Sequence, residues 1–295
     1  MRSRPLVAVV GVDGSSPSMH AARWAADEAD RRRLSLRLLY CTSDASDDVE
    51  PIVDPDFSAE PVTGRAQAVL DVAARAVARA HPSLDVQTGC ERGNPWRVLV
   101  RASERACLVV VGTRSGRLLN FLLESVPLDL TARAHAPVAV IPENCEQRGG
   151  PVVVGVDGSG ANRAAIGFAM DEAAVHGVGV VGILGKRQWP AGDSGDRPTL
   201  IDPADAQPEH ALIAEEFAGW RGKYPDVPVR HHVFRGSPAD CLLGYAADEQ
   251  PEHRPLMVVV GSRGRGPVAG LLLGSTSHAL IARARCPVAV VRGSS

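Results

Sequence analysis

The sequence has few aromatic residues. Phe, Trp and Tyr together make up 4% of its 295 residues, while hydrophobic residues reach 45%. The core must then be built from Ala, Val and Leu, which is typical of parallel sheets covered by helices. Charged residues make up 22%, a balance that argues against general disorder.

Strong net charge and long apolar runs are also missing. The net charge is -2, which gives no electrostatic reason to expect nucleic acid or an anionic membrane as a partner. No segment approaches the roughly eighteen apolar residues of a membrane span. The first apolar run, which Asp13 ends, is too short for a signal peptide. We expect a soluble, cytoplasmic protein.

The six cysteines form neither a CxxC pair nor a metal-binding spacing. We expect small buried apolar residues in a reducing compartment. Cys145 lies in a polar connector and is expected to be the most exposed of the six.

The chain is one unit written twice. Three stretches recur in the same order: VAVVGVDGSS (7–16) as PVVVGVDGSG (151–160), CLVVVGTRSG (107–116) as LMVVVGSRGR (256–265), and ARAHAPVAVI (132–141) as ARARCPVAVV (282–291). A single recurrence of this length indicates domain duplication, not a solenoid. We predict domains over residues 1–145 and 150–295, joined by a polar connector.

Strands and helices alternate in each half. The predicted strands cover 7–12, 36–41, 84–90, 108–111 and 137–140 in the first half, and 151–156, 180–184, 227–234, 257–260 and 287–290 in the second. A first helix is predicted where Ala21, Trp24, Ala25 and Ala29 recur at helical spacing, and further helices over about 65–80 and 209–222. The Asp- and Pro-rich stretches 42–63 and 185–208 are predicted to be loops. Asn94 and Ser237 are predicted N-caps, each followed by Pro at the first helical position. The pattern predicts an α/β fold with a mainly parallel five-stranded sheet in each half and helices on both faces.

Ligands of such sheets bind at the carboxyl ends of the strands, where the strand order reverses. A strand order of 3-2-1-4-5 brings the end of strand one (Asp13; Asp157) beside the end of strand four (Gly112; Gly261). Two unusual stretches of each half thereby become one candidate pocket.

The later copy of this pocket contains a glycine pattern. Gly261, Gly264 and Gly274 follow G-x-x-G-x9-G, and Ser275 and Thr276 come next at a predicted helix start. Glycines let backbone N–H groups approach an anion, and a helix N-terminus adds free N–H groups. Arg263 and Arg265 add positive charge near the rim. A structural strand-to-helix turn is the alternative, but the full spacing favours phosphate binding. There is no P-loop, and GRGPVAG (264–270) follows the wrong strand for a dinucleotide fingerprint.

Asp13 and Asp157 end strand one in VDGS. A carboxylate there could accept hydrogen bonds from a ribose or approach a phosphate-bound Mg²⁺. Helix capping is an equally good explanation from position alone, although Ser15, Ser16 and Ser159 could provide the caps instead.

VVVGVDGS, MVVVGSRGRGPVAGLLLGSTSHAL and CPVAVVR resemble the universal stress protein family in its tandem form, and the resemblance covers essentially the whole chain twice. It implies a Rossmann-like fold of the adenine nucleotide alpha hydrolase type and, in the ATP-binding branch, bound ATP, often with Mg. It further implies a regulatory role in stress, hypoxia or growth arrest. The implied ligand residues are Val156, Asp157, Ile183, Val260, Gly261, Arg263, Gly264, Gly274, Ser275 and Thr276. Within this set the glycines, Ser275 and Thr276 would hold phosphates and ribose, Val156 and Asp157 the nucleoside, and Ile183 the adenine.

The first half departs from the pattern. Gly112 is kept, Gly116 replaces Gly264 only with a one-residue shift, and Glu124 stands where the second half has Gly274. A carboxylate beside phosphates repels them. We therefore predict a weaker or absent site in the first half, formed by Val12, Asp13, Gly112, Arg114, Gly116, Ser125 and Val126.

No GxSxG motif and no positioned base for water attack can be found in the sequence. We expect at most weak ATP hydrolysis, and no metal site beyond a Mg²⁺ that ATP brings near Asp157. A weak ATPase or phosphotransferase, and a scaffold that works without nucleotide, are the alternative functions. The PVAV strands are candidate edges for pairing the halves as a pseudo-dimer, and a homodimer of chains is also predicted.

Overall fold

The computed structural model describes residues 6–42, 62–114, 125–143, 145, 149–159, 162–186, 198–247, 254–263 and 273–293. These residues form two compact units, one ending at Glu143 and the other beginning at Cys145. The predictions for Gly116, Glu124, Gly264 and Arg265, and for residues 43–61 of the predicted loop 42–63, lie outside the described residues.

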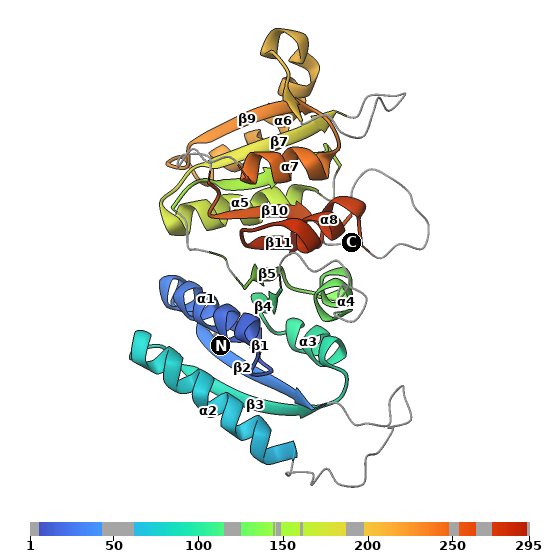
Figure 1. Cartoon of the computed structure of the whole chain (residues 1–295). Helices are drawn as coiled ribbons and strands as arrows, with labels where there is room; N and C mark the ends of the chain where they lie inside the picture. The colour runs from blue at the N-terminus through green and yellow to red at the C-terminus, as the bar shows by residue number, and fades with distance from the viewer. Residues whose placement is uncertain are drawn as a thin grey trace, which may run out of the picture. The chain divides into compact units, whose positions relative to one another are not determined.

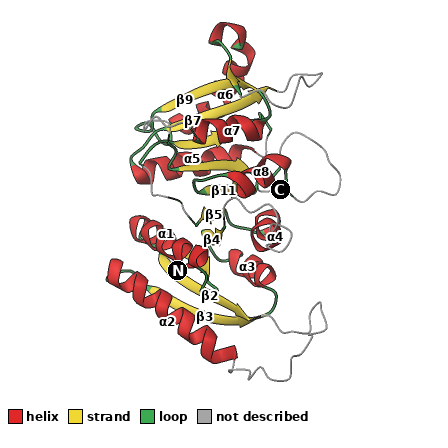
Figure 2. Cartoon of the chain, in the orientation of Figure 1, coloured by secondary structure: helices red, strands yellow, loops and turns green. Residues whose placement is uncertain are grey.

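The first unit is an α/β layer (Figures 1 and 2). Its elements are β1 (Val7–Gly11), α1 (Ser16–Arg32), β2 (Ser35–Thr42), α2 (Val62–Ala80), β3 (Val86–Arg92), α3 (Pro95–Ser103), β4 (Leu108–Thr113), α4 (Ser125–Arg133) and β5 (Val138–Pro142). All its strands pair in parallel. Their order, β3-β2-β1-β4-β5, is the order expected from the sequence.

Two glycines show that helices cover both faces of this sheet. A Cβ on Gly11 would contact Leu99 of α3, whereas a Cβ on Gly112 would meet the backbone of Pro17 and Ser18 in α1. Val10 of β1 pairs with Val110 of β4, so Gly11 lies level with Val111. Because side chains alternate along a strand, Gly11 and Gly112 point to opposite faces. Helices α1 and α3 therefore lie on opposite faces.

The second unit repeats this architecture with one addition. Its elements are β6 (Val152–Gly155), α5 (Asn162–His176), β7 (Val180–Lys186), β8 (Thr199–Leu200), the 3-10 helix η1 (Pro203–Asp205), α6 (Gln207–Arg221), β9 (Val229–Arg235), α7 (Pro238–Ala246), β10 (Met257–Gly261), α8 (Ser275–Arg283) and β11 (Val288–Val291). The strand order β11-β10-β6-β7-β9 matches that of the first unit and is parallel throughout.

The predicted loop over 185–208 was wrong in its described part. Strand β8 pairs antiparallel with β9, with Leu200 opposite Phe234, and η1 and the start of α6 follow it. A two-residue strand has no periodicity of its own and exists only because the edge of β9 offers it hydrogen bonds. The polar composition of the stretch therefore concealed it.

Valine runs form the inner strands. Val109 and Val110 of β4, and Val258 and Val259 of β10, are each 0% exposed. Residues on both faces of these strands are buried, which explains their continuous apolar sequence. The predicted doubly wound layers are confirmed in both units.

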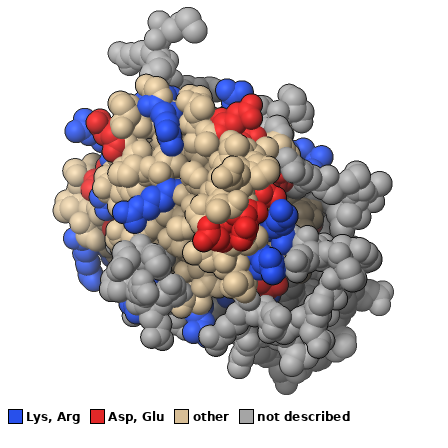
Figure 3. Space-filling model, turned by 90° about the horizontal axis from the view of Figure 1, so that it is seen from above, with Lys and Arg blue, Asp and Glu red and all other residues tan. Residues whose placement is uncertain are grey.

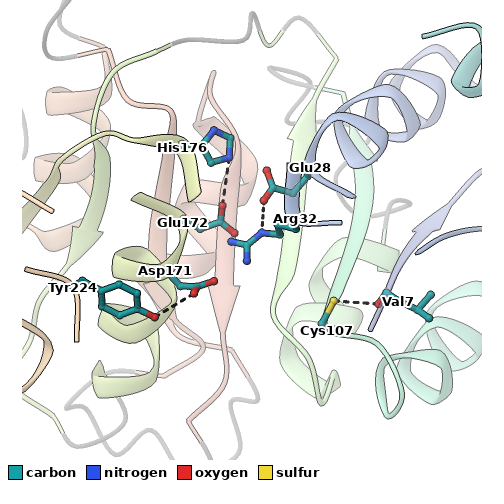
Figure 4. A network of polar contacts seen from close by, with 8 residues as sticks. All are labelled: Val7, Glu28, Arg32, Cys107, Asp171, Glu172, His176 and Tyr224. Atoms are coloured by element: carbon teal, nitrogen blue, oxygen red, sulfur yellow. Dashed lines mark hydrogen bonds and ion pairs between the residues drawn. The ribbon is translucent and has the colours of Figure 1, made fainter. Parts of the chain in front are cut away.

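The equivalent glutamates of the first helix in each unit are buried, and each has a partner one turn later (Figure 4). Glu28 pairs with Arg32 in α1, and His176 Nε2 lies 3.7 Å from Glu172 Oε2 in α5. A buried carboxylate needs such partners because burial alone disfavours its charge. In the second unit, Tyr224 Oη also donates to Asp171 Oδ1 at 3.1 Å.

The cysteine prediction was partly wrong. All six lie in the described residues and none forms a disulfide, but Cys90 is the exposed one, and Cys145 is only 4% exposed. Cys90 lies on β3, which among the described strands pairs only with β2, so an edge strand exposes it. The polar neighbours of Cys145 indicate a surface segment but do not determine where one side chain points.

The adjacent histidines His231 and His232 face opposite sides of β9, as predicted. The ring of His231 lies 4.9 Å from that of His210 on α6, and the ring of His232 lies 5.9 Å from that of Tyr245 on α7. Among the described helices, none has the length and apolar character to cross a membrane.

Candidate functional site

The candidate site of the second unit lies where two neighbouring strands end. Val154 of β6 pairs with Val259 of β10, so the carboxyl ends of these parallel strands meet at one edge of the sheet. Asp157 follows β6, and Gly261 is the last residue of β10. The sequence-predicted neighbours are therefore brought together.

Helix α8 is fixed to the end of β10 by two hydrogen bonds. Gly274 N–H donates to Ser262 O, and Ser277 Oγ donates to Gly261 O, both at 2.8 Å. Gly274 is the N-cap, with φ -70° and ψ 150°, and as a glycine it offers the helix no side-chain acceptor. The N-terminal N–H groups of α8 therefore lack the side-chain acceptor that Ser15, Asn94 and Ser237 give α1, α3 and α7. As predicted, Ser275 opens the helix.

An ion pair fixes the other end of α8. Arg283 Nη1 lies 3.1 Å from Asp240 Oδ1 on α7, and Ser237 Oγ donates to Asp240 Oδ2 at 2.6 Å. The hydrogen bond from Ser237 is the largest cause that lowers the pKa of Asp240, and Arg283 adds to it. Two independent contacts thus position the helix that opens at the site.

The turn after β6 contains both paired and unpaired polar side-chain atoms. Asp157 Oδ1 accepts a hydrogen bond from Ser159 N–H at 2.8 Å. Asn162, the first residue of α5, is 3% exposed, and its Nδ2 donates to Gly155 O at 2.7 Å. Ser159 Oγ and Asn162 Oδ1 are buried and have no hydrogen-bond partner within the described part of the chain.

The equivalent turn of the first unit is closed on itself. Asp13 Oδ1 accepts from both Ser15 N–H (2.9 Å) and Ser15 Oγ (2.6 Å). Ser18 Oγ accepts from Asp13 N–H at 3.2 Å and donates to Ser15 O at 3.0 Å. Burial would raise the pKa of Asp13, but the hydrogen bonds from Ser15 and Ser18 outweigh it and lower that pKa. Ser15 also caps α1, so the serine, not Asp13, is the cap.

Three predicted ligand residues of the second unit have core side chains. Val156 and Val260 are each 4% exposed and Ile183 is 1% exposed. Val156 N–H donates to Ile183 O at 2.8 Å, which joins the ends of β6 and β7. Arg263 and Ser275 are exposed, and Thr276 is half-buried.

The first unit presents the matching positions. Val12 is 3% exposed, Arg114 is exposed, Val126 is half-buried, and Ser125 is the first residue of α4. A Cβ on Gly112 would lie 2.8 Å from Ser18 N and closer still to the Pro17 carbonyl. Packing of α1 against β4 therefore requires this glycine, whether or not it contacts a phosphate.

Asn162 and Ser277 were not predicted from the sequence, and Ser159 was considered only as a cap. A comparison of the two halves could have found them, because Asn162 stands where the first half has Ser18, and Ser277 where it has Pro127.

Figure 3 shows one face of the molecule, on which Lys and Arg side chains lie interspersed with Asp and Glu among larger areas of other residues.

Comparisons with known proteins decide the family. Residues 7–142 and 150–292 each match the model of the universal stress protein family. The chain belongs to the universal stress protein family. It is 35% identical to the universal stress proteins Rv2005c and Rv2623 of Mycobacterium tuberculosis over 295 residues, which covers 97% of this chain and 97% and 96% of theirs.

Solved structures agree with the fold of this universal stress protein. The crystal structure of a universal stress protein from Archaeoglobus fulgidus aligns with a TM-score of 0.66 at 19% identity, covering 97% of this chain and 98% of that one. Two shorter universal stress proteins, one in complex with cAMP and one from Archaeoglobus fulgidus in complex with dAMP, cover 48% and 46% of this chain, with TM-scores of 0.37 and 0.34 and identities of 23% and 18%.

Proposed function

We propose that the second unit of this tandem universal stress protein binds ATP, accompanied by Mg²⁺, as a regulatory ligand in a stress response. One observation carries the proposal: α8 has a glycine N-cap without a side-chain acceptor, and it begins at the end of β10, the neighbour of the strand that leads to Asp157. The cAMP and dAMP complexes are properties of those two relatives. For this chain, the proposal depends on its own helix and turn.

The residues present suit a nucleotide. The uncapped N–H groups of α8, with the hydroxyls of Ser275 and Thr276, suit phosphate oxygens. The half-buried carboxylate of Asp157 suits the nucleoside or a phosphate-bound cation. Mg²⁺, when bound, would neutralise phosphate charge. The core side chains of Val156 and Ile183 hold the strand ends against which the nucleoside would lie.

Titration of the full chain with ATP and Mg²⁺ tests the proposal. Gly274→Glu places in the second half the residue that the first half has in Glu124. Gly274 has an extended backbone, with φ -70°, that any residue can adopt. The effect of the Gly274→Glu substitution therefore comes from the added side chain. Two unit charges 4 Å apart repel by about 4 kcal/mol at an effective dielectric constant of 20. We expect Gly274→Glu to weaken ATP binding by at least about 100-fold.

Gly274→Ala is the matched control, because it adds a Cβ without charge. It should cost far less affinity than Gly274→Glu. A wild-type chain that binds no ATP, or a Gly274→Glu chain that binds it unchanged, would exclude the second-half site.

The first unit is proposed to bind ATP weakly or not at all. Freshly purified protein should then contain about one nucleotide per chain. Two per chain would show that Glu124 is tolerated. Glu124→Gly tests the reverse exchange and should raise the binding of a second ATP only slightly, because the turn at Asp13 is closed independently of Glu124.

A regulatory ligand should be turned over slowly. Steady phosphate release that stops in Asp157→Ala would favour the ATPase alternative. The pairing of the two halves along their PVAV strands and a homodimer of chains stay predictions from the sequence. Light scattering of the full chain checks the homodimer.

A further inference from the structure

Beside Asp157, two buried polar oxygens have no hydrogen-bond partner among the residues that the structure describes. Asn162 is 3% exposed, and the bond from its Nδ2 to Gly155 O fixes which way its amide faces. Its Oδ1 is therefore an acceptor, and no described residue donates a hydrogen bond to it. Ser159 Oγ is in the same state. An unsatisfied buried polar atom costs about 1–3 kcal/mol, so native structures usually satisfy such atoms with water or a ligand.

These two oxygens belong to the candidate site. Ser159 N–H donates to the carboxylate of Asp157, and Asn162 N–H donates to Ser159 O at 2.9 Å. All three residues thus lie in one turn at the carboxyl edge of the sheet. Helix α5 packs on both β6 and β10, the two strands whose ends form the site.

The first unit shows that the sequence can close this turn without any ligand. There Ser18 replaces Asn162, and its hydroxyl bonds both to Asp13 N–H and to Ser15 O. Ser15 Oγ, the equivalent of Ser159 Oγ, donates to the Asp13 carboxylate. The same turn is self-satisfied in one unit and open in the other.

We propose that Ser159 and Asn162 are ligand-binding residues that receive the ribose hydroxyls of the nucleotide, so that the second unit selects ribonucleotides over deoxyribonucleotides. This inference depends on the proposed function. The turn offers the Asp157 carboxylate and the Asn162 oxygen, which only accept, and one hydroxyl that accepts and donates. Phosphate at neutral pH has almost no hydrogen to donate and is repelled by Asp157. A ribose diol supplies two donors on adjacent atoms. The adenine amino group is the other donor of the nucleotide, and the test separates the two.

The test titrates the full chain with ATP, 2′-deoxy-ATP, 3′-deoxy-ATP and purine riboside triphosphate, which lacks the amino group. The variants are Ser159→Ala and Asn162→Ser, which installs the residue of the first unit. Ser15→Ala is the matched control in the other unit. One neutral hydrogen bond contributes about 0.5–1.5 kcal/mol, which corresponds to about 2- to 12-fold in affinity.

We expect the wild-type chain to bind ATP about 2- to 12-fold more tightly than at least one of the deoxy analogues. Each second-unit variant should lose a similar factor for ATP and little for that analogue, so that the discrimination shrinks. Ser15→Ala should leave the discrimination unchanged. A site that hydrogen-bonds a hydroxyl rejects the analogue without it, because its own polar groups are then left unpaired.

Three results would overturn the inference. In the first, the variants lose affinity for ATP and both deoxy analogues but not for purine riboside triphosphate. The two oxygens would then bind the adenine amino group instead of a ribose hydroxyl. Variants that bind ATP and both deoxy analogues like the wild type, with Asn162→Ser only lowering the melting temperature, would assign the oxygens to a structural water. In both cases ATP binding and its sensitivity to Gly274→Glu persist, and the proposed function stands. A wild-type chain that binds no ATP removes both.

Discussion

Gly112→Ala should destabilise the first unit, because this strand end approaches a helix backbone. A Cβ at this position would lie 2.8 Å from Ser18 N and nearer still to the Pro17 carbonyl. Backbone atoms cannot rotate away as a side chain can, so the start of α1 must move off β4. Overpacking typically costs 1–3 kcal/mol, and we expect about 3 kcal/mol here. For a domain of this size that corresponds to a melting temperature lower by roughly 6–12 °C.

Gly64→Ala is the matched control for this substitution. Gly64 lies in α2, and a Cβ there would have nothing within 4 Å. The same change should therefore raise stability by up to about 1 kcal/mol through helix propensity. Calorimetry measures both shifts, and hydrogen exchange should show lost protection in α1 and β4 for Gly112→Ala alone. If Gly112→Ala melts with the wild type, the close approach of α1 and β4 is not a constraint and the reasoning fails.

Two further predictions concern stability. Arg33 (φ 56°) and Gly177 (φ 65°) have left-handed backbones at the ends of α1 and α5. In thermal unfolding, Arg33→Gly should raise stability and Gly177→Ala should lower it, each by about 1 kcal/mol, because only glycine adopts this backbone without strain. Stability changes of the same sign for the two variants would contradict this. Asp240, whose pKa is lowered by Ser237 and then Arg283, contributes stability above its unfolded pKa near 4 that is lost as the pH falls through the lower folded pKa. Asp240→Asn should therefore cost about 0.5 kcal/mol at pH 7, since the ion pair is half-exposed. The difference should shrink as the pH falls through the unfolded and then the lower folded pKa, and a difference that stays constant over acid pH would count against it.

Strand order and helix starts could be predicted from the sequence because their signals are local or repeated. A continuous run of valines indicates a strand buried on both faces. Because the chain repeats the unit, each element could be predicted from two independent stretches of sequence. The N-caps Asn94 and Ser237 were predicted for the same reason, since a cap, a proline and a helix form one short pattern. Strand β8 could not be predicted, because the edge of a distant strand creates it.

The candidate site was predictable in place but not in detail. Neighbouring strand ends follow from the topology, so Asp157 and Gly261 could be brought together from the sequence. The unpaired oxygen of Asn162 could not be predicted. Gly155 O fixes the orientation of the amide, and the absence of a donor near Oδ1 among the described residues is visible only in the folded structure. The packing role of Gly112 likewise depends on how closely α1 approaches β4.

The two units show which interactions a duplicated fold can exchange. Arg133 and Arg283 are equivalent, yet Arg133 stacks over Trp96, 5.0 Å from its ring centroid, while Arg283 pairs with Asp240. Both arrangements hold the fourth helix of the unit against the third, so packing accepts either. The proposed nucleotide would be less tolerant, because it would need unpaired acceptors and helix N–H groups at fixed positions. In the first unit the turn at Asp13 satisfies its own polar atoms, and this closure is separate from the glutamate that replaces a glycine in the loop. In the proposed function the two changes would act on different parts of the nucleotide, so reverting either one alone would leave the other barrier in place.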